Sequence, residues 1–149
     1  LLLCFLFTLN CGFKILDKSE QNNFTIKEIK SFGDKRINFK IKNNLLSNSL
    51  KKTEKNVQMS LTTIKTKNIK EKNIKNEISK YEIVLDSSIV FNVNQNDKIY
   101  TISVSATGDY TVDSSYSTTL NKEKKLIENL INDISEKILD NVQKELNDI

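Results

Sequence analysis

The side chains that could do chemistry in this chain are few. Cys4 and Cys11 are its only cysteines among 149 residues, and it contains no His. Beyond residue 11 the chain therefore has no imidazole base, no thiolate and no soft metal ligand, which excludes most hydrolytic, redox and zinc chemistry. With three Gly and no Pro, it also lacks a glycine-rich phosphate-binding loop. We expect no cofactor and no metal site.

Two carboxylates could be imagined as an acid–base pair. Asp109 and Asp113 flank Tyr110, and their other neighbours are mainly Thr and Ser. A general acid needs a raised pKa, which requires apolar surroundings or a like charge, and this stretch offers no apolar surroundings. A hydrolase that uses the carboxylates between Asp86 and Asp113 is thus the weakest of the functional hypotheses.

The first eleven residues carry the clearest signal. Residues 1–9 form an apolar run, much shorter than the roughly 20 residues of a membrane-spanning helix. Such a run before a cysteine is typical of the end of a bacterial lipoprotein signal peptide, in which Cys11 would receive the lipid. A disulfide between Cys4 and Cys11 is the alternative, although it would lie within a segment that is normally removed. We predict a signal-peptide remnant at 1–10, a lipidated linker at 11–23 and a single domain at 24–149.

Charge is distributed unevenly along the chain. Residues 11–80 hold seventeen basic and seven acidic residues, whereas residues 81–149 hold six and twelve. Five lysines are concentrated in one short stretch: Lys65, Lys67, Lys70, Lys72 and Lys75. They could meet phosphate groups or a negatively charged protein surface, or they could simply form a solvated face. Nucleic-acid binding is disfavoured, because no aromatic residues are interleaved with these lysines.

The elements that position these residues follow from hydrophobic periodicity. The apolar residues of 36–52 fit both the helical period and the alternation of a strand, and the length of this segment without a helix breaker favours a helix. Residues 119–146 place Ile127, Ile131, Ile134 and Ile138 on one helical stripe. The first half of the chain is predicted to contain a strand at 24–30, a turn at 31–34 with Asp34 as helix cap, a helix at 36–52 and a strand at 57–62. Residues 65–80 are predicted to form strand extensions around a mobile loop. A hairpin of strands at 81–93 and 100–106, which Tyr110, Val112 and Tyr116 could prolong, then leads to a helix at 119–146.

This element order predicts an α+β fold. The order β-α-β-β-β-α gives a two-layer sandwich in which a four-stranded mixed sheet carries two helices on one face. The stripe on the last helix is expected to be core against that sheet, and a helix of this length can cover the whole hairpin.

In arrangement the chain resembles the LPS-assembly lipoprotein family (LptE-like). The features that match, in order, are Cys11-Gly12-Phe13, a first strand at Ile26–Ile29, the helical segment Lys42-Asn43-Asn44-Leu45-Leu46, a long hairpin, and Tyr110–Tyr116 leading into a long amphipathic helix. The likeness covers nearly the whole chain after Cys11.

The resemblance implies a non-enzymatic lipoprotein on the periplasmic face of the outer membrane, held there by lipid on Cys11. It would support and plug the β-barrel LPS-assembly protein (LptD-like) and assist insertion of lipopolysaccharide into the outer leaflet. The five lysines would then contact lipopolysaccharide phosphates or the barrel wall. No nucleic-acid partner is implied. The alternative that we keep is a periplasmic lipid-binding or transport-system lipoprotein without a barrel partner.

Overall fold

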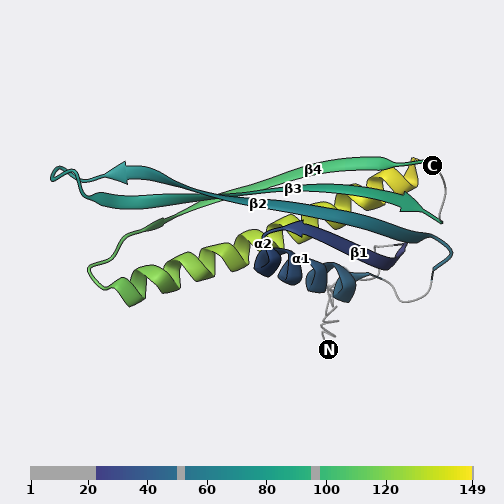
Figure 1. The fold of residues 1–149 in the computed structure, drawn as a ribbon, viewed down its shortest axis with the longest axis horizontal. Coiled ribbons are helices and arrows are strands. Elements are labelled where there is room, and N and C mark those ends of the chain that lie inside the picture. Colours follow the sequence, from purple (N-terminus) through teal and green to yellow (C-terminus); the bar gives the residue numbers. More distant parts are fainter. Residues whose placement is uncertain (1–22, 50–52, 95–97, 149) are drawn as a thin grey trace, which may run out of the picture.

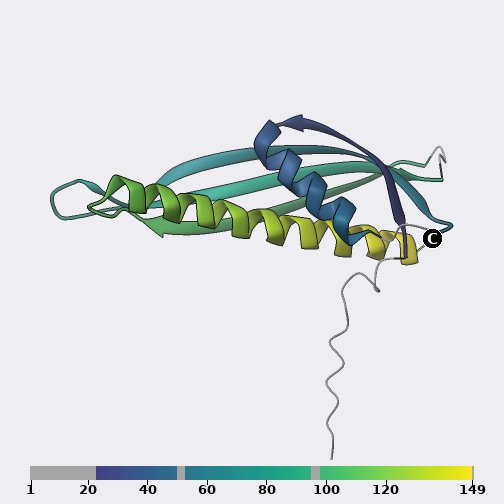
Figure 2. The same ribbon diagram turned by 90° about the horizontal axis from the view of Figure 1, so that it is seen from below.

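A computed structural model of the chain describes residues 23–49, 53–94 and 98–148. Its elements, in chain order, are β1 (Thr25–Gly33), α1 (Lys35–Asn48), β2 (Asn56–Lys72), β3 (Ile78–Val93), β4 (Tyr100–Thr111) and α2 (Tyr116–Asn147). The strands form one sheet in the order β1-β2-β3-β4, and both helices cover the same face of it (Figures 1 and 2). The predicted α+β sandwich is confirmed.

The sheet is mixed because α1 carries the chain back over it. β1 and β2 are joined through this helix and pair in parallel, whereas β2, β3 and β4 form antiparallel hairpins. Alternate side chains of β2 and β3 point toward the helices, and Leu61, Ile83, Leu85 and Ile89 are fully buried there. Among the residues that the structure describes, no helix covers the opposite face of the sheet.

The start of α1 is set by residues on both sides of a turn. The Asp34 carboxylate accepts hydrogen bonds from the Arg36 and Ile37 amides, so the predicted cap is confirmed. The turn predicted at 31–34 is wrong for residues 31–33, since β1 continues to Gly33 and these three residues pair with residues 61–63 of β2. The helix ends at Asn48, earlier than predicted; residues 50–52 lie outside the described residues.

The β2–β3 hairpin is longer and more regular than its sequence indicates. β2 continues to Lys72, and the turn between the strands spans only residues 73–77. The Asn73 carboxamide oxygen accepts from the amides of Lys75 and Glu77, and Asn76 has a positive φ of 62°. The predicted strand extensions are therefore confirmed, but the mobile loop between them is replaced by a closed turn.

The last helix contains the predicted apolar stripe. Ile131, Ile134, Ile138 and Val142 are all buried against the sheet. α2 begins at Tyr116, so Tyr116 does not prolong β4, which ends at Thr111. Among the described residues, neither helix combines the length and the apolar character needed to cross a membrane.

Candidate functional site

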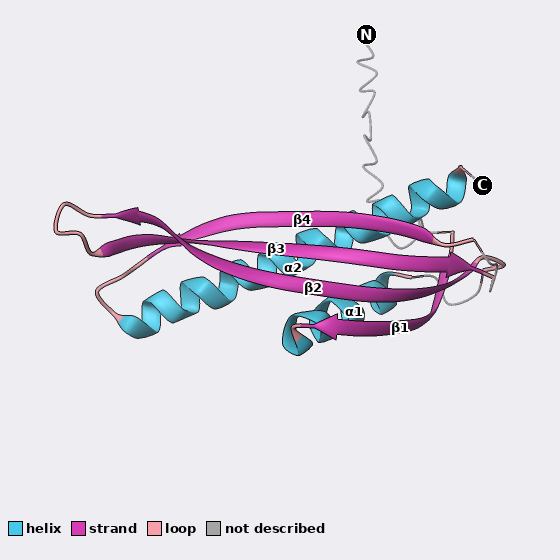
Figure 3. Ribbon diagram, turned by 45° about the horizontal axis from the view of Figure 1, so that its top comes forward, coloured by secondary structure: helices cyan, strands magenta, loops and turns pink. Residues whose placement is uncertain are grey.

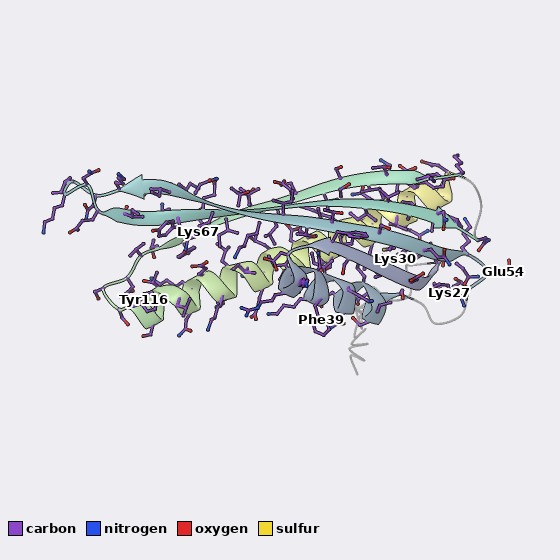
Figure 4. All side chains as sticks on the ribbon, in the orientation of Figure 1. Lys27, Lys30, Phe39, Glu54, Lys67 and Tyr116 are labelled. Carbon is purple, nitrogen blue, oxygen red and sulfur yellow. The ribbon has the colours of Figure 1, made fainter. Side chains whose placement is uncertain are left out.

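A cleft opens where the core ends. The N-terminal turns of α2 diverge from the sheet, and a hollow of about 370 Å³ lies between them. Figure 4 shows Lys67 on the sheet and Tyr116 at the start of the helix, on two walls of this cleft. Its other lining residues are Ile78, Tyr81, Tyr110, Val112, Asp113, Ser114, Thr119, Leu120 and Glu123.

A network of charged and aromatic groups closes the inner end of the cleft. Glu123 Oε2 on α2 accepts a hydrogen bond from Lys67 Nζ at 2.8 Å and another from the Tyr110 hydroxyl at 2.7 Å. The rings of Tyr81 and Tyr110 stack with their centroids 5.7 Å apart. Lys67 Nζ lies 4.4 Å from the centre of the Tyr81 ring, within the range of a cation–π contact.

This network shifts the titration of both charged partners. Partial burial disfavours the charged form of Glu123, but the hydrogen bonds from Lys67 and Tyr110 outweigh it and lower the pKa of Glu123. Partial burial likewise opposes the charge on Lys67, and the hydrogen bonds to Glu123 and Tyr110 outweigh it, so that the pKa of Lys67 is raised. The pair is thus held in its ionised state, which suits a positioning role.

The two carboxylates considered for acid–base chemistry are not brought together. Asp109 lies on the sheet face away from the helices, where it accepts from Lys70 at 2.9 Å. Asp113 lies in the β4–α2 connection, where it caps the Ser115 amide and pairs with Lys122 at 3.2 Å. These contacts lower both pKa values, which is the opposite of what a general acid requires. The part of the chain that the structure describes also contains no cluster of three or more possible metal-ligating His, Cys, Asp or Glu side chains.

The structure divides the five candidate lysines into those with a carboxylate partner and those without one among the described residues. Lys67 and Lys70 form ion pairs, with Glu123 and Asp109 respectively. The Lys72 ammonium group donates to the Asn76 carboxamide. Those of Lys65 and Lys75 make no hydrogen bond or ion pair with any other described residue. Four of the five lie on β2 itself, and only Lys75 lies in the turn after it.

Ion pairs connect the basic first half of the chain to its acidic second half. Lysines from the basic first half reach carboxylates of the acidic second half: Lys67 pairs with Glu123, Lys70 with Asp109, and Lys40 of α1 with Glu128 of α2. Part of the positive charge is therefore neutralised within the fold.

Sequence reasoning did not identify Tyr81 and Glu123 as parts of the site, although one signal was present. Glu123 precedes Ile127 by one helical repeat of four residues, so it falls on the apolar stripe of α2. A carboxylate at such a position must find a partner when the stripe is buried. The predicted lipid attachment residue, Cys11, lies outside the described residues.

The same small α+β fold occurs in solved structures that bear the name lipoprotein. One structure that shares it is the rare lipoprotein B from Shewanella oneidensis, with a TM-score of 0.60 and 11% sequence identity, over 80% of this chain and 97% of that one. Another is an uncharacterized lipoprotein B from Nitrosomonas europaea, with a TM-score of 0.61 and 14% identity, over 91% and 93% of the two chains. No protein-family model and no curated protein matches the sequence.

Proposed function

We propose that this chain is a non-enzymatic lipoprotein of the outer membrane. In this proposal it is anchored on the periplasmic face through lipid on Cys11. There it supports and plugs a β-barrel lipopolysaccharide translocon, and it assists insertion of lipopolysaccharide into the outer leaflet.

The observation that carries the proposal is the shared fold. This fold spans nearly the full length of two structures that bear the name lipoprotein, and in the present chain it follows a segment with the features of a lipoprotein signal ending at Cys11. The order of elements is also the one on which the resemblance to the LPS-assembly lipoprotein family rests.

The uncovered face of the sheet suits contact with the polar interior of a barrel. Many of its side chains are polar and uncharged, as at Thr62, Ser88, Ser103 and Ser105, which line one shallow hollow together with Ile64 and Asp86. The interiors of outer-membrane barrels are polar and contain water, and hydroxyl groups can hydrogen-bond there directly or through that water. A protein surface of this kind also supplies the second interaction that a lipid anchor needs for lasting attachment.

The lysines in the outer half of the β2–β3 hairpin, which we call the hairpin end, supply the proposed contact with lipopolysaccharide. Lys65, Lys72 and Lys75 have ammonium groups without a carboxylate partner among the described residues. They can therefore pair with phosphate groups without first breaking an ion pair. Lys67 and Lys70 would contribute mainly to the positive field of this region.

The anchor is tested on the full-length chain expressed in a Gram-negative host. We expect mass spectrometry of the N-terminal peptide to find an acylated Cys11, and we expect membrane fractionation to place the protein in the outer membrane. Cys11→Ser should release it into the soluble periplasmic fraction, whereas Cys4→Ser serves as the matched control and should leave it in the membrane. An unmodified Cys11 in a membrane-bound protein would contradict the proposal.

The lipid-carrier alternative makes a different prediction. A carrier needs to shelter an acyl chain from water, whereas the cleft beside Lys67 and Glu123 is open and lined by charged and polar groups as well as aromatic ones. Native mass spectrometry of the purified protein in mild detergent decides between them. A stoichiometric bound phospholipid, in the absence of any barrel, would favour the carrier.

A further inference from the structure

One edge of the sheet is left open where β1 stops. β1 pairs with β2 only as far as Gly33 and Thr63, whereas β2 continues to Lys72 and is paired on its other side with β3 throughout. Figures 2 and 3 show β1 ending partway along β2, with the remainder of β2 uncovered on that side. We call the segment from Ile64 to Lys72 the open edge.

The alternating direction of the backbone N–H and C=O groups along β2 identifies which of them face outward on the open edge. The Thr63 carbonyl points toward the β1 side, since it accepts from the Asp34 amide. The N–H and C=O of one residue in a strand point to the same side, and the side alternates from residue to residue. The backbone groups of Lys65, Lys67 and Ile69 therefore face outward, until the register shift after Ile69. No described residue donates to or accepts from these outward groups by a hydrogen bond.

The outer edges of β1 and β4 differ from the open edge. Lys42 of α1 donates to the Ile29 carbonyl of β1 at 3.1 Å, and Lys137 of α2 donates to the Ser105 carbonyl of β4 at 2.8 Å. Both long side chains lie across an edge that a further strand would have to approach. On the open edge no described side chain donates to an outward-facing carbonyl in this way.

The side chains around the open edge indicate what kind of strand would fit. The stretch 64–72 carries four lysines and one glutamate, and Lys65 and Lys67 share the helix-facing side of β2 with buried Leu61. On the other face Ile64 is 61% exposed, and Phe32 at the end of β1 is 59% exposed. At the start of the open edge, a strand that extends the line of β1 would thus meet lysines on one face and apolar groups on the other. Farther along, the faces are mixed, because Ile69, 53% exposed, shares the side of Lys65 and Lys67, and Lys70 lies on the side of Ile64.

We propose that the open edge binds an extended acidic segment of a partner protein by β-strand addition, with carboxylates toward Lys65 and apolar side chains toward Ile64 and Phe32. Strand addition gives affinity through main-chain hydrogen bonds and selectivity through alternate side chains. A second copy of this chain is a poor occupant, because it would set lysines against lysines and like charges opposite one another destabilise a strand pair. The proposal goes beyond the lipopolysaccharide role, because it involves neither lipid nor barrel, although the two roles share Lys65.

The test is amide hydrogen exchange of the full-length, ¹⁵N-labelled chain in detergent micelles, followed by NMR. The probe is a nine-residue peptide with blocked ends that alternates Glu and Val. At saturation we expect exchange at the Lys65, Lys67 and Ile69 amides to slow at least tenfold. Exchange at Ser103 and Thr107, which lie on the outer edge of β4, should not change.

Matched probes separate strand pairing from simple charge attraction. The same peptide N-methylated at its five central residues keeps its charge but cannot pair, so it should give no protection. A peptide with Lys in place of Glu should give none either. Equal protection by the N-methylated peptide, protection at the β4 edge instead, or no protection by the acidic peptide at millimolar concentration would each overturn the proposal.

Two variants of the chain complete the test. Lys65→Pro removes an outward N–H that makes no bond to β3, and proline is tolerated at such edge positions, so the fold should persist while peptide protection is lost. Lys65→Thr keeps the N–H and removes only the charge; it should retain protection at a several-fold weaker affinity. Unchanged peptide binding by a folded Lys65→Pro chain would contradict strand addition.

Discussion

At the scale of single residues, Glu123 shows how a polar group ends a hydrophobic core. It occupies the position of the apolar stripe one repeat before Ile127, and there it accepts from both Lys67 and Tyr110. Its partners come from β2 and β4, far away in the sequence. The sequence could reveal that Glu123 was out of place on the stripe, but not which residues would compensate its charge, because that depends on the register of three strands.

The lowered pKa of Glu123 predicts a pH-dependent contribution to stability. Because its pKa in the folded state lies below the ordinary value of 4.5, the carboxylate stabilises the fold above that ordinary value, and the stabilisation is lost as pH falls through the lowered pKa. Glu123→Gln should reduce the free energy of unfolding by about 1 kcal/mol at pH 7. Urea denaturation from pH 7 to pH 3 should show this difference shrinking toward zero.

Glu128→Gln is the control for this prediction. Glu128 also belongs to α2 and forms an ion pair with a lysine, Lys40, but both side chains are more than half exposed. Exposed ion pairs contribute little to the free energy of unfolding, so this variant should be less destabilised than Glu123→Gln at pH 7. Equal effects of the two substitutions would show that the network at the cleft has no special role in stability.

A second prediction at this scale concerns lipopolysaccharide. Replacing Lys65, Lys72 and Lys75 together with Gln should weaken binding to lipopolysaccharide-containing vesicles by at least tenfold, since three ammonium groups that face solvent are removed. Surface plasmon resonance at two salt concentrations measures the change, and the salt dependence of binding should fall as well.

A triple variant of equal charge at the other end of the molecule provides the comparison. Lys27, Lys30 and Lys144 are exposed, and Figure 4 shows Lys27 and Lys30 at the end of the sheet away from Lys67. Replacing these three with Gln should leave vesicle binding within about twofold, because the removed charges lie beyond a Debye length from the hairpin end. Equal losses in both triple variants would mean that net charge, and not the hairpin end, governs binding.

At the scale of elements, Gly33 determines where β1 ends and the open edge begins. Its φ is 93°, a conformation that glycine adopts readily and other residues do not. A Cβ at this position would lie 2.5 Å from the Thr63 carbonyl oxygen, which is backbone and has little room to move. The turn from β1 into α1 therefore requires glycine.

Gly33→Ala is accordingly expected to destabilise the protein by about 2 kcal/mol or more, from backbone strain and the clash together. Gly108→Ala is the comparison, because its Cβ would meet the end of the flexible Leu126 side chain, which can rotate away. Thermal unfolding should show a clearly larger decrease in Tm for Gly33→Ala. The reverse order would contradict this account of the turn.

Hydrophobic periodicity predicted the helices and strands that bury one face. It predicted the bounds of the other segments less exactly. The stripe on α2 and the alternation of β3 were predicted because Ile134, Ile138, Leu85 and Ile89 are in contact with the core. The extension of β2 was predicted, but its end at Lys72 was not, because beyond Thr63 both of its faces are polar or exposed. When a strand is stabilised mainly by hydrogen bonds to the neighbouring strand, its sequence shows little hydrophobic alternation from which its length could be predicted.

At the scale of the whole molecule, the fold separates three surfaces. The helices cover one face of the sheet, the other face is polar and uncovered, and the β2–β3 hairpin extends beyond α1 and β1 at one end (Figure 3). α1 also carries two exposed apolar side chains, Phe39 at 65% and Leu46 at 40%. An elongated body with distinct faces suits a component that is held within a larger assembly.

The proposed function makes this chain the lipoprotein partner of an outer-membrane barrel. The most direct test is affinity purification of the tagged full-length protein from detergent-solubilised outer membranes, followed by mass spectrometry of the partner and of its stoichiometry. We predict a single β-barrel protein at a one-to-one ratio that is retained through a second, size-exclusion step. Recovery of an outer-membrane protein with acylated Cys11 and no barrel at any salt concentration would contradict the claim.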